Sequence, residues 1–180
     1  MAVRRGLIRQ QAESLLAKFK VAGGPVPVEK IARSLGIDIK PDNVDDDLSG
    51  FIVRDGRSKR TVIGVNKSHH ARRQRFTIAH ELGHYLLHKG QTVHLDENRG
   101  AFTVNLRNSE SAKGEDPEER EANLFAAELL MPAKFLQQDL YEEDLDLLGD
   151  SDVLAKLAKK YDVSVQALTF RLANLGFITR

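Results

Sequence analysis

The sequence predicts an α+β protein in which a small β-sheet packs on a long helix, followed by a second long helix and two C-terminal helices. Three observations support this fold class. Two β-rich runs, at residues 50–53 and 61–65, flank a turn signal. Apolar residues recur at helical spacing both before and after these runs. A His-Glu-x-x-His pattern at residues 80–84 lies in the middle of the longest helical segment.

Two helices are predicted before the sheet. Apolar residues at helical spacing indicate the first helix, and Gly23-Gly24-Pro25 ends it. These apolar residues are Leu7, Ile8, Leu15, Leu16 and Phe19. Val28–Leu35 forms a short second helix that Gly36 ends, and Asp42–Asp47 is predicted to be a solvated acidic loop.

A β-hairpin is predicted next. Gly50–Val53 and Thr61–Val65 are its strands, and Arg54–Arg60 joins them. Asp55-Gly56 within the connection is a typical hairpin turn pair.

The segment from His69 to Lys89 has the pattern of a long helix, which Asn66 or Ser68 would cap and Gly90 would end. Its apolar stripe consists of Phe76, Ala79, Gly83 and Leu86. A glycine inside a helix costs about 1 kcal/mol relative to alanine. Gly83 therefore indicates either the close approach of another backbone or a ligand, or a sheet packed closely against the helix.

A second long helix begins after a segment of weaker signals. Val93–Leu95 and Phe102–Val104 are predicted short strands, and Asn108–Gly114 is a polar loop. The helix start is well marked, because Asp116 stands at the N-cap with Pro117 at the first helical position and Glu119 at the third. The helix runs to Met131-Pro132.

The C-terminal part resembles a helix-turn-helix. After the acidic segment Asp139–Asp152, helices are predicted at Val153–Tyr161 and Val165–Leu175, with Ser164 as N-cap of the latter. A short strand is predicted at Gly176–Ile178. We divide the chain into a domain of residues 1–145 and a helix-turn-helix-like subdomain of residues 146–180.

Composition excludes several classes of protein. The chain is 41% hydrophobic and 29% charged with a formal net charge of +1, so no global field favours nucleic acid or a membrane as the main partner. It contains no cysteine, so a zinc ion would need histidine and carboxylate ligands. No apolar run is long enough for a membrane span or a signal peptide, and we expect a cytoplasmic protein.

The pattern His80-Glu81-Leu82-Gly83-His84 predicts a zinc-hydrolase site. Histidines four residues apart lie on the same face of a helix, so both imidazoles can reach one ion. Glu81 points to a neighbouring face, where it can act as a general base without being a ligand.

The spacing leaves the third ligand open. His88 lies about 12 Å along the helix axis from His80, too far to share an ion, and is interpreted as a C-terminal residue favoured by the helix dipole. His94 is a candidate ligand or transition-state donor. Glu118, Glu119 and Glu121 in the second helix are further candidate ligands. Glu119 also fits as a capping glutamate, and Asn123, on the same face, can hydrogen-bond a ligand.

Two segments resemble the ImmA/IrrE family of metallopeptidases. The first is the motif at residues 80–84 with Arg73–Ala79 before it and Leu86-Leu87-His88 after it, and the second is Glu119–Pro132. The resemblance covers residues 28 to 135. It implies a minimal zincin-like fold, also described as gluzincin-like, whose third ligand comes from the second helix. Glu119 matches the family motif, with Glu121 as the fallback.

The resemblance also implies a mechanism and a substrate. His80, His84 and Glu119 would bind Zn²⁺, with Mn²⁺ as an alternative, and Glu81 would be the general base of an endopeptidase. The candidate oxyanion donors are His94, Tyr85 and Tyr141. Relatives typically cleave a helix-turn-helix repressor, which relieves repression of a mobile element or a stress response.

A second hypothesis is a metal-containing, non-proteolytic binding module, of a regulatory or toxin–antitoxin type, that contacts DNA or a repressor. A DNA-reading helix should present several basic or amide side chains. The last helix offers Gln166, Arg171 and Asn174, and the helix before it offers Lys156, Lys159 and Lys160. Because this set is small, we expect these helices to pack on the fold or dock a repressor rather than contact DNA.

Overall fold

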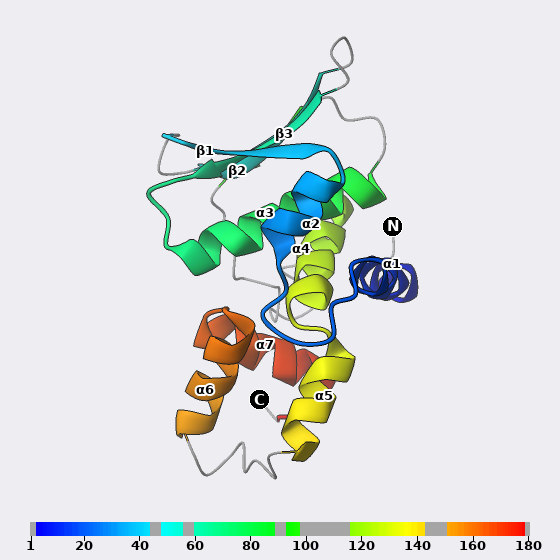
Figure 1. Cartoon of the computed structure of the whole chain (residues 1–180), viewed down its shortest axis with the longest axis vertical. Coiled ribbons are helices and arrows are strands. Elements are labelled where there is room, and N and C mark those ends of the chain that lie inside the picture. The colour runs from blue at the N-terminus through cyan, green and yellow to red at the C-terminus, as the bar shows by residue number, and fades with distance from the viewer. Residues whose placement is uncertain are drawn as a thin grey trace.

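The computed structural model describes residues 3–43, 48–55, 60–88, 93–97, 116–142 and 151–178 (Figure 1). Within these ranges the chain forms seven helices and four strands, so the α+β prediction is confirmed. The strands lie at one end of the molecule and the three C-terminal helices at the other, with two long helices between them (Figure 1). No helix in the described ranges is long and apolar enough to span a bilayer.

The four strands form one sheet in the order β1-β3-β2-β4. They are β1 (Ile37–Asp42), β2 (Leu48–Asp55), β3 (Arg60–Asn66) and β4 (Val93–Glu97). β2 and β3 pair antiparallel with Ile52 opposite Ile63, which confirms the predicted hairpin, although residues 56–59 of its turn lie outside the described residues. β4 pairs antiparallel with β2, so the strand predicted at Val93–Leu95 is also confirmed.

Strand β1 was not predicted. It pairs parallel with β3 at the edge of the sheet, where Pro41 is tolerated because an edge strand has no second ladder to complete. Its last residue, Asp42, had been assigned to the acidic loop, and residues 44–47 of that loop lie outside the described residues.

Helices α1 (Arg5–Lys18) and α2 (Val28–Ser34) lie where they were predicted. The predicted end of α1 at Gly23-Gly24-Pro25 is wrong, because α1 ends at Lys18 with Phe19 as its C-cap. The apolar side of α1 is buried through Ile8, Leu15 and Leu16. Gly36 ends the α2 region with a φ of +79°, a left-handed conformation in which glycine carries no Cβ penalty.

Helix α3 (Ala71–Leu87) is the predicted long helix, but its cap differs from the prediction. The N-cap is His70, whose Nδ1 accepts from the backbone N–H of Arg72 at 3.2 Å. Asn66 instead closes the preceding turn, because its Oδ1 accepts from the N–H of Ser68 at 2.9 Å. Gly90, the predicted end of the helix, lies outside the described residues.

Helix α4 (Pro117–Leu130) begins as predicted, with the Asp116 carboxylate accepting from the N–H of Glu118 at 3.0 Å. It packs on α3 where Gly83 lies. A Cβ added to Gly83 would be 3.1 Å from Cα and 3.2 Å from O of Ala122, so the close approach is that of a helix backbone. The strand predicted at Phe102–Val104 and the loop Asn108–Gly114 lie outside the described residues.

Three helices complete the chain: α5 (Ala133–Glu142), α6 (Ser151–Tyr161) and α7 (Val165–Leu175). Ser164 caps α7 as predicted, whereas α5 was not foreseen. The strand predicted at residues 176–178 is wrong. Gly176 adopts a φ of +80°, and the N–H of Phe177 bonds the carbonyl of Leu172 at 3.0 Å, so this segment closes α7.

One hydrophobic cluster extends across the described chain. It includes Ile8 of α1, Leu82 of α3, Phe125 and Leu129 of α4, and Leu168 of α7. Residues of both predicted domains thus contribute to the same core. The boundary between residues 145 and 146 lies outside the described residues and stays a prediction.

Candidate metal centre

His80 and His84 lie one turn apart on α3, beneath the sheet. Both are 2% exposed, and their Nε2 atoms are 3.1 Å apart. Burial of the two rings fixes both Nε2 atoms toward the same point, as the i, i+4 spacing predicted.

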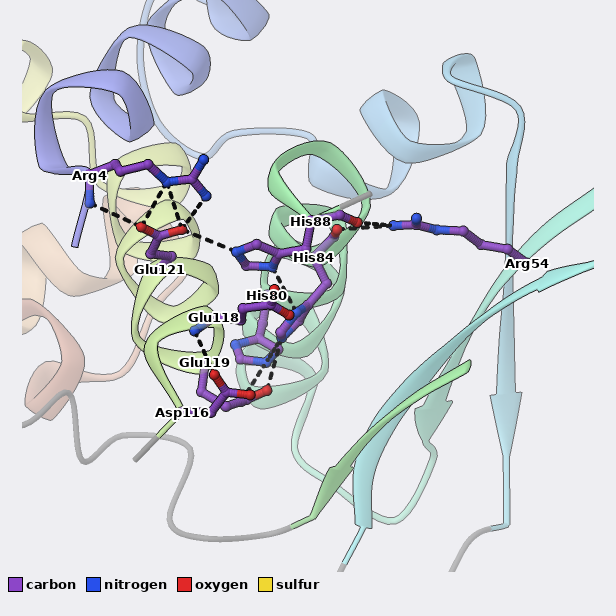
Figure 2. A network of polar contacts seen from close by, with 9 residues as sticks. All are labelled: Arg4, Arg54, His80, His84, His88, Asp116, Glu118, Glu119 and Glu121. Atoms are coloured by element: carbon purple, nitrogen blue, oxygen red, sulfur yellow. Dashed lines mark hydrogen bonds and ion pairs between the residues drawn. The ribbon is translucent and has the colours of Figure 1, made fainter. Parts of the chain in front are cut away.

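Glu119, in the first turn of α4, faces the two imidazoles (Figure 2). Its Oε2 is 3.4 Å from Nε2 of His80, and its Oε1 is 3.2 Å from Nε2 of His84. The carboxylate of Glu119 is directed at the histidines although the residue stands at the third helical position, where a capping glutamate is typical.

The three side chains have the geometry of a single ion site. One donor atom from each lies within 4.8 Å of the others. A tetrahedral zinc with bonds of 2.0–2.1 Å separates its ligand atoms by about 3.3 Å, which the distances within this cluster approach. Two imidazole lone pairs and a carboxylate oxygen directed at one point repel each other, and a divalent cation offsets that repulsion. The residues present therefore fit zinc.

The far nitrogens of both imidazoles are also held. Nδ1 of His80 lies 3.0 Å from Oδ1 of Asn123, which accepts the hydrogen bond, so the predicted contact of Asn123 with a candidate ligand is confirmed. Nδ1 of His84 lies 3.1 Å from Nδ1 of His88. Such outer contacts orient a ligating imidazole and fix its tautomer.

His88 is the C-cap of α3, in agreement with its interpretation as a C-terminal residue, but that interpretation missed its side-chain role. The ring is buried between α3 and α4, with Nε2 3.2 Å from Oε2 of Glu121 (Figure 2). The repeat of histidine at residues 80, 84 and 88 was the available signal, since it places three rings on one helix face.

Glu121, the fallback ligand, lies outside the three-residue cluster. Its Oε1 accepts from the backbone N–H and from Nε of Arg4, each at 3.0 Å, and its Oε2 pairs with the terminal guanidinium nitrogen Nη2 of the same arginine. Hydrogen bonds from the Arg4 side chain lower the pKa of Glu121 to about 2, although burial opposes the shift. The structure therefore brings Glu119, not Glu121, to His80 and His84.

Glu81 is fully buried on α3, in the turn that carries both histidines, and it does not belong to the donor cluster. Its role as a general base stays a prediction. Glu118, the remaining glutamate candidate in the first turn of α4, is not in the cluster either.

The three oxyanion candidates differ in position. Tyr85 packs under the guanidinium of Arg54, whose Cζ is 5.1 Å from the ring centroid. Arg54 also donates to the carbonyl oxygens of His84 and His88, at 3.0 and 3.1 Å, and so completes the C-terminal end of α3. Tyr141 is 86% exposed near the end of α5. His94 lies in β4 opposite Ile52 of β2, and its side chain lies outside the described residues.

A His/His/Glu set on two packed helices defines a candidate divalent-metal centre of the metallohydrolase type. Residues 32–173 match the family model of the IrrE N-terminal-like domain. The chain is also 32% identical over 162 residues to uncharacterized immunity region protein 2 of Bacillus phage phi105, covering 88% of this chain and 90% of the phage protein. The chain belongs to the ImmA/IrrE family of metallopeptidases.

Two named metallopeptidases are similar over shorter stretches. Metallopeptidase ImmA of Bacillus subtilis is 35% identical over 92 residues, which is 51% of this chain and 47% of that protein. Radiation response metalloprotease IrrE of Deinococcus radiodurans is 33% identical over 124 residues, which is 67% of this chain and 34% of that protein. The chain thus spans less than half the length of either protein.

A solved structure, titled Mycobacterium tuberculosis transcriptional regulator, superimposes with a TM-score of 0.60 at 17% identity. It covers 92% of this chain and 46% of that one, and it shows a shared fold.

Proposed function

We propose that the chain is a zinc-dependent endopeptidase with a zincin-like fold, in which His80, His84 and Glu119 hold the ion. The observation that supports this most directly is the cluster of three donor atoms within 4.8 Å. Mn²⁺ is an alternative occupant, because imidazole and carboxylate ligands also suit it. When bound, the ion would supply Lewis-acid polarisation of the scissile carbonyl and generate a nucleophile from water at neutral pH.

The residues of the chain have distinct roles in this proposal. Glu81 accepts the proton from the attacking water and then delivers it to the leaving amine. Asn123 and His88 hold the imidazoles of His80 and His84, so neither ring has to reorient during the reaction. The buried position of both imidazoles also keeps bulk water from competing for the donor atoms.

We propose a helix-turn-helix transcriptional repressor as the substrate, whose cleavage would relieve repression of a mobile element or a stress response. The names of two relatives support the mobile-element and stress-response settings of this proposal. One comes from the immunity region of a phage, and another is a metalloprotease of the radiation response.

The runner-up proposal is a metal-containing binding module that contacts DNA or a repressor without cleaving it. One observation counts against DNA contact by α7. Arg171 is buried, with its guanidinium 2.6 Å from Oε2 of Glu128 and 3.0 Å from the carbonyl of Met131. The side chain most suited to a phosphate or a guanine is thus used inside the fold, which supports packing rather than DNA reading.

Metal content of the purified protein tests the site. We expect about one zinc per chain in the wild type and none after dialysis in His84→Ala or Glu119→Gln. Glu118→Gln is the matched control, because it changes a neighbouring carboxylate outside the cluster and should retain the metal. A wild-type protein that is folded but binds neither added Zn²⁺ nor added Mn²⁺ would contradict the proposal.

Glu81→Gln tests the chemistry separately. We expect this variant to bind zinc like the wild type and to lose turnover by at least about 10²-fold, since amide replaces base without a change of size. The measurement is mass spectrometry of fragments from purified helix-turn-helix repressors. Equal cleavage by wild type and variant would contradict the role of Glu81. Repressor or DNA binding without fragments in the wild type would favour the binding module.

A further inference from the structure

Four side chains form a continuous row from the N-terminus to the candidate metal centre. Arg4 lies just before α1, Glu121 on α4, His88 at the C-cap of α3, and His84 on α3 (Figure 2). The successive contacts are Arg4 Nε to Glu121 Oε1 at 3.0 Å, Glu121 Oε2 to His88 Nε2 at 3.2 Å, and His88 Nδ1 to His84 Nδ1 at 3.1 Å. Glu121, His88 and His84 are all buried, so water does not replace these contacts.

The carboxylate of Glu121 determines which atom donates in each hydrogen bond of the row. A carboxylate held by a guanidinium and a backbone N–H only accepts, so Nε2 of His88 must donate to Glu121. In a neutral imidazole the other nitrogen then has no hydrogen, and Nδ1 of His88 accepts. His84 must therefore donate from Nδ1, which leaves the lone pair of its Nε2 facing His80 and Glu119.

We propose that Arg4, Glu121 and His88 are positioning residues that fix the tautomer of His84 in the form able to bind the metal. The inference rests on the proposed metal site and extends it to residues that touch no ligand atom of the cluster except through His84. It also gives the N-terminal segment a role in the centre, since Arg4 contributes both its backbone N–H and its side chain to Glu121.

An isosteric change at Glu121 can reverse the donor and acceptor roles along the row. In Glu121→Gln, we expect the amide oxygen to take the Oε1 position, where the backbone N–H and Nε of Arg4 both donate at 3.0 Å. The amide N–H₂ then takes the Oε2 position, where it displaces Nη2 of Arg4 and faces Nε2 of His88. That nitrogen must then accept, Nδ1 of His88 carries the hydrogen, and His84 must accept at Nδ1. The remaining hydrogen of His84 would sit on Nε2 and block coordination. We expect zinc to bind about 10- to 100-fold more weakly, the range found when an outer partner of a ligand is lost.

Glu128→Gln is the matched control. Glu128 lies on the same helix, is equally buried and is also held by arginines, with Arg171 at 2.6 Å and Arg9 at 3.4 Å. None of its described contacts involves a histidine of the row. A general loss of α4 packing would weaken zinc binding in both variants, whereas loss of the tautomer would weaken it only in Glu121→Gln.

Two measurements on the full-length chain decide the question. The first is the affinity for Zn²⁺, by competition with a chromophoric chelator. The second is the ring ¹⁵N spectrum of the metal-free protein, which distinguishes the two neutral tautomers of His84 and His88. We expect Nδ1–H on His84 in the wild type and in Glu128→Gln, and Nε2–H in Glu121→Gln. An unchanged His84 tautomer in Glu121→Gln, or equal zinc affinity in both variants, would overturn the proposal.

Substitutions at His88 provide a second test that does not depend on the folding of Glu121→Gln. His88→Asn places a carbonyl oxygen where Nδ1 stood, so His84 can still donate to it, whereas His88→Leu removes the acceptor. We expect the Asn variant to bind Zn²⁺ at least about 10-fold more tightly than the Leu variant. Equal affinities would contradict the inference. A wild type that shows the expected tautomers but binds no zinc would instead contradict the proposed function alone.

Discussion

Replacing Arg171 by methionine tests how the C-terminal helices are held to the fold. The buried guanidinium donates to both oxygens of Glu128, at 3.2 and 2.6 Å, and to the carbonyl of Met131 at 3.0 Å. Methionine keeps an apolar stem but removes the charge and all three bonds. Breaking a buried pair on one side costs about 3–5 kcal/mol, because the remaining charge stays in a dry environment.

Arg9 reduces that cost, since its Nε lies 3.4 Å from the same carboxylate of Glu128. We therefore expect Arg171→Met to lower the free energy of unfolding by about 3 kcal/mol, at the lower end of the range. For a chain of this size the corresponding fall in Tm is about 6–12 °C. Urea denaturation followed by circular dichroism measures the free energy, and a thermal scan measures Tm.

Two further variants make the result interpretable. Arg9→Met removes the partner of Glu128 whose side chain is 51% exposed, and we expect it to cost less than about 1 kcal/mol. The double variant Arg171→Met with Glu128→Met should recover most of the loss, because it removes both buried charges. If Arg171→Met lowers the free energy of unfolding no more than Arg9→Met does, the buried pair does not hold α7. The argument that Arg171 is committed to the fold rather than to DNA would then be wrong.

Two other predictions concern α3 and the N-terminal pair. Gly83→Ala should lower the free energy of unfolding by up to about 2 kcal/mol, because overpacking on the α4 backbone outweighs the gain in helix propensity. The control is Gly6→Ala, where an added Cβ meets open space. If urea denaturation shows that Gly83→Ala gains stability as Gly6→Ala does, the prediction is wrong. The pKa of Glu121 falls from its ordinary value of 4.5 to about 2, so its pairing with Arg4 should stabilise the fold above about pH 4.5 and lose that effect as the pH falls toward 2. The stability difference between wild type and Arg4→Ala should shrink over this interval in acid titrations, and a constant difference would refute it.

The features that could be predicted from sequence are those decided within a few residues of chain. The i, i+4 spacing of His80 and His84 fixes a shared helix face, and Asp116-Pro117 fixes the start of α4. The hairpin follows for the same reason, because alternation and a turn pair are local. The bond between Asn123 and His80 also follows from local spacing, but only after α3 and α4 are known to pack on each other.

The choice between Glu119 and Glu121 required contacts that no local pattern contains. Both residues stand in the first part of an acidic helix, and either side chain is long enough to reach a metal. The difference is that Glu121 bonds Arg4 and His88, which lie 117 and 33 positions from it along the chain. Partners at that distance are determined by tertiary packing, so helix propensity and motif spacing leave them undetermined.

The errors in secondary structure have a related cause. Residues 176–178 are apolar enough for a strand, but a strand needs a partner, and the backbone groups of Gly176 and Phe177 are already bonded to α7. β1 is the opposite case. Its charged, proline-containing sequence carries little strand signal, and the parallel ladder with β3 makes it a strand.

Helix α4 shows how acidic residues in one helix acquire different roles. At about 100° per residue, Glu119 and Glu121 point to faces roughly 200° apart, whereas Glu121 and Glu128 lie within about 20° of one face. The Glu121/Glu128 face meets arginines of α1 and its N-terminal flank, which neutralise both buried carboxylates. The Glu119 face meets the imidazoles of α3 instead. An arginine paired with a ligand carboxylate would compete with a metal ion for its charge. Arg4 and Arg9 pair with Glu121 and Glu128, whereas the carboxylate of Glu119 is directed at the two histidines with which it would share an ion.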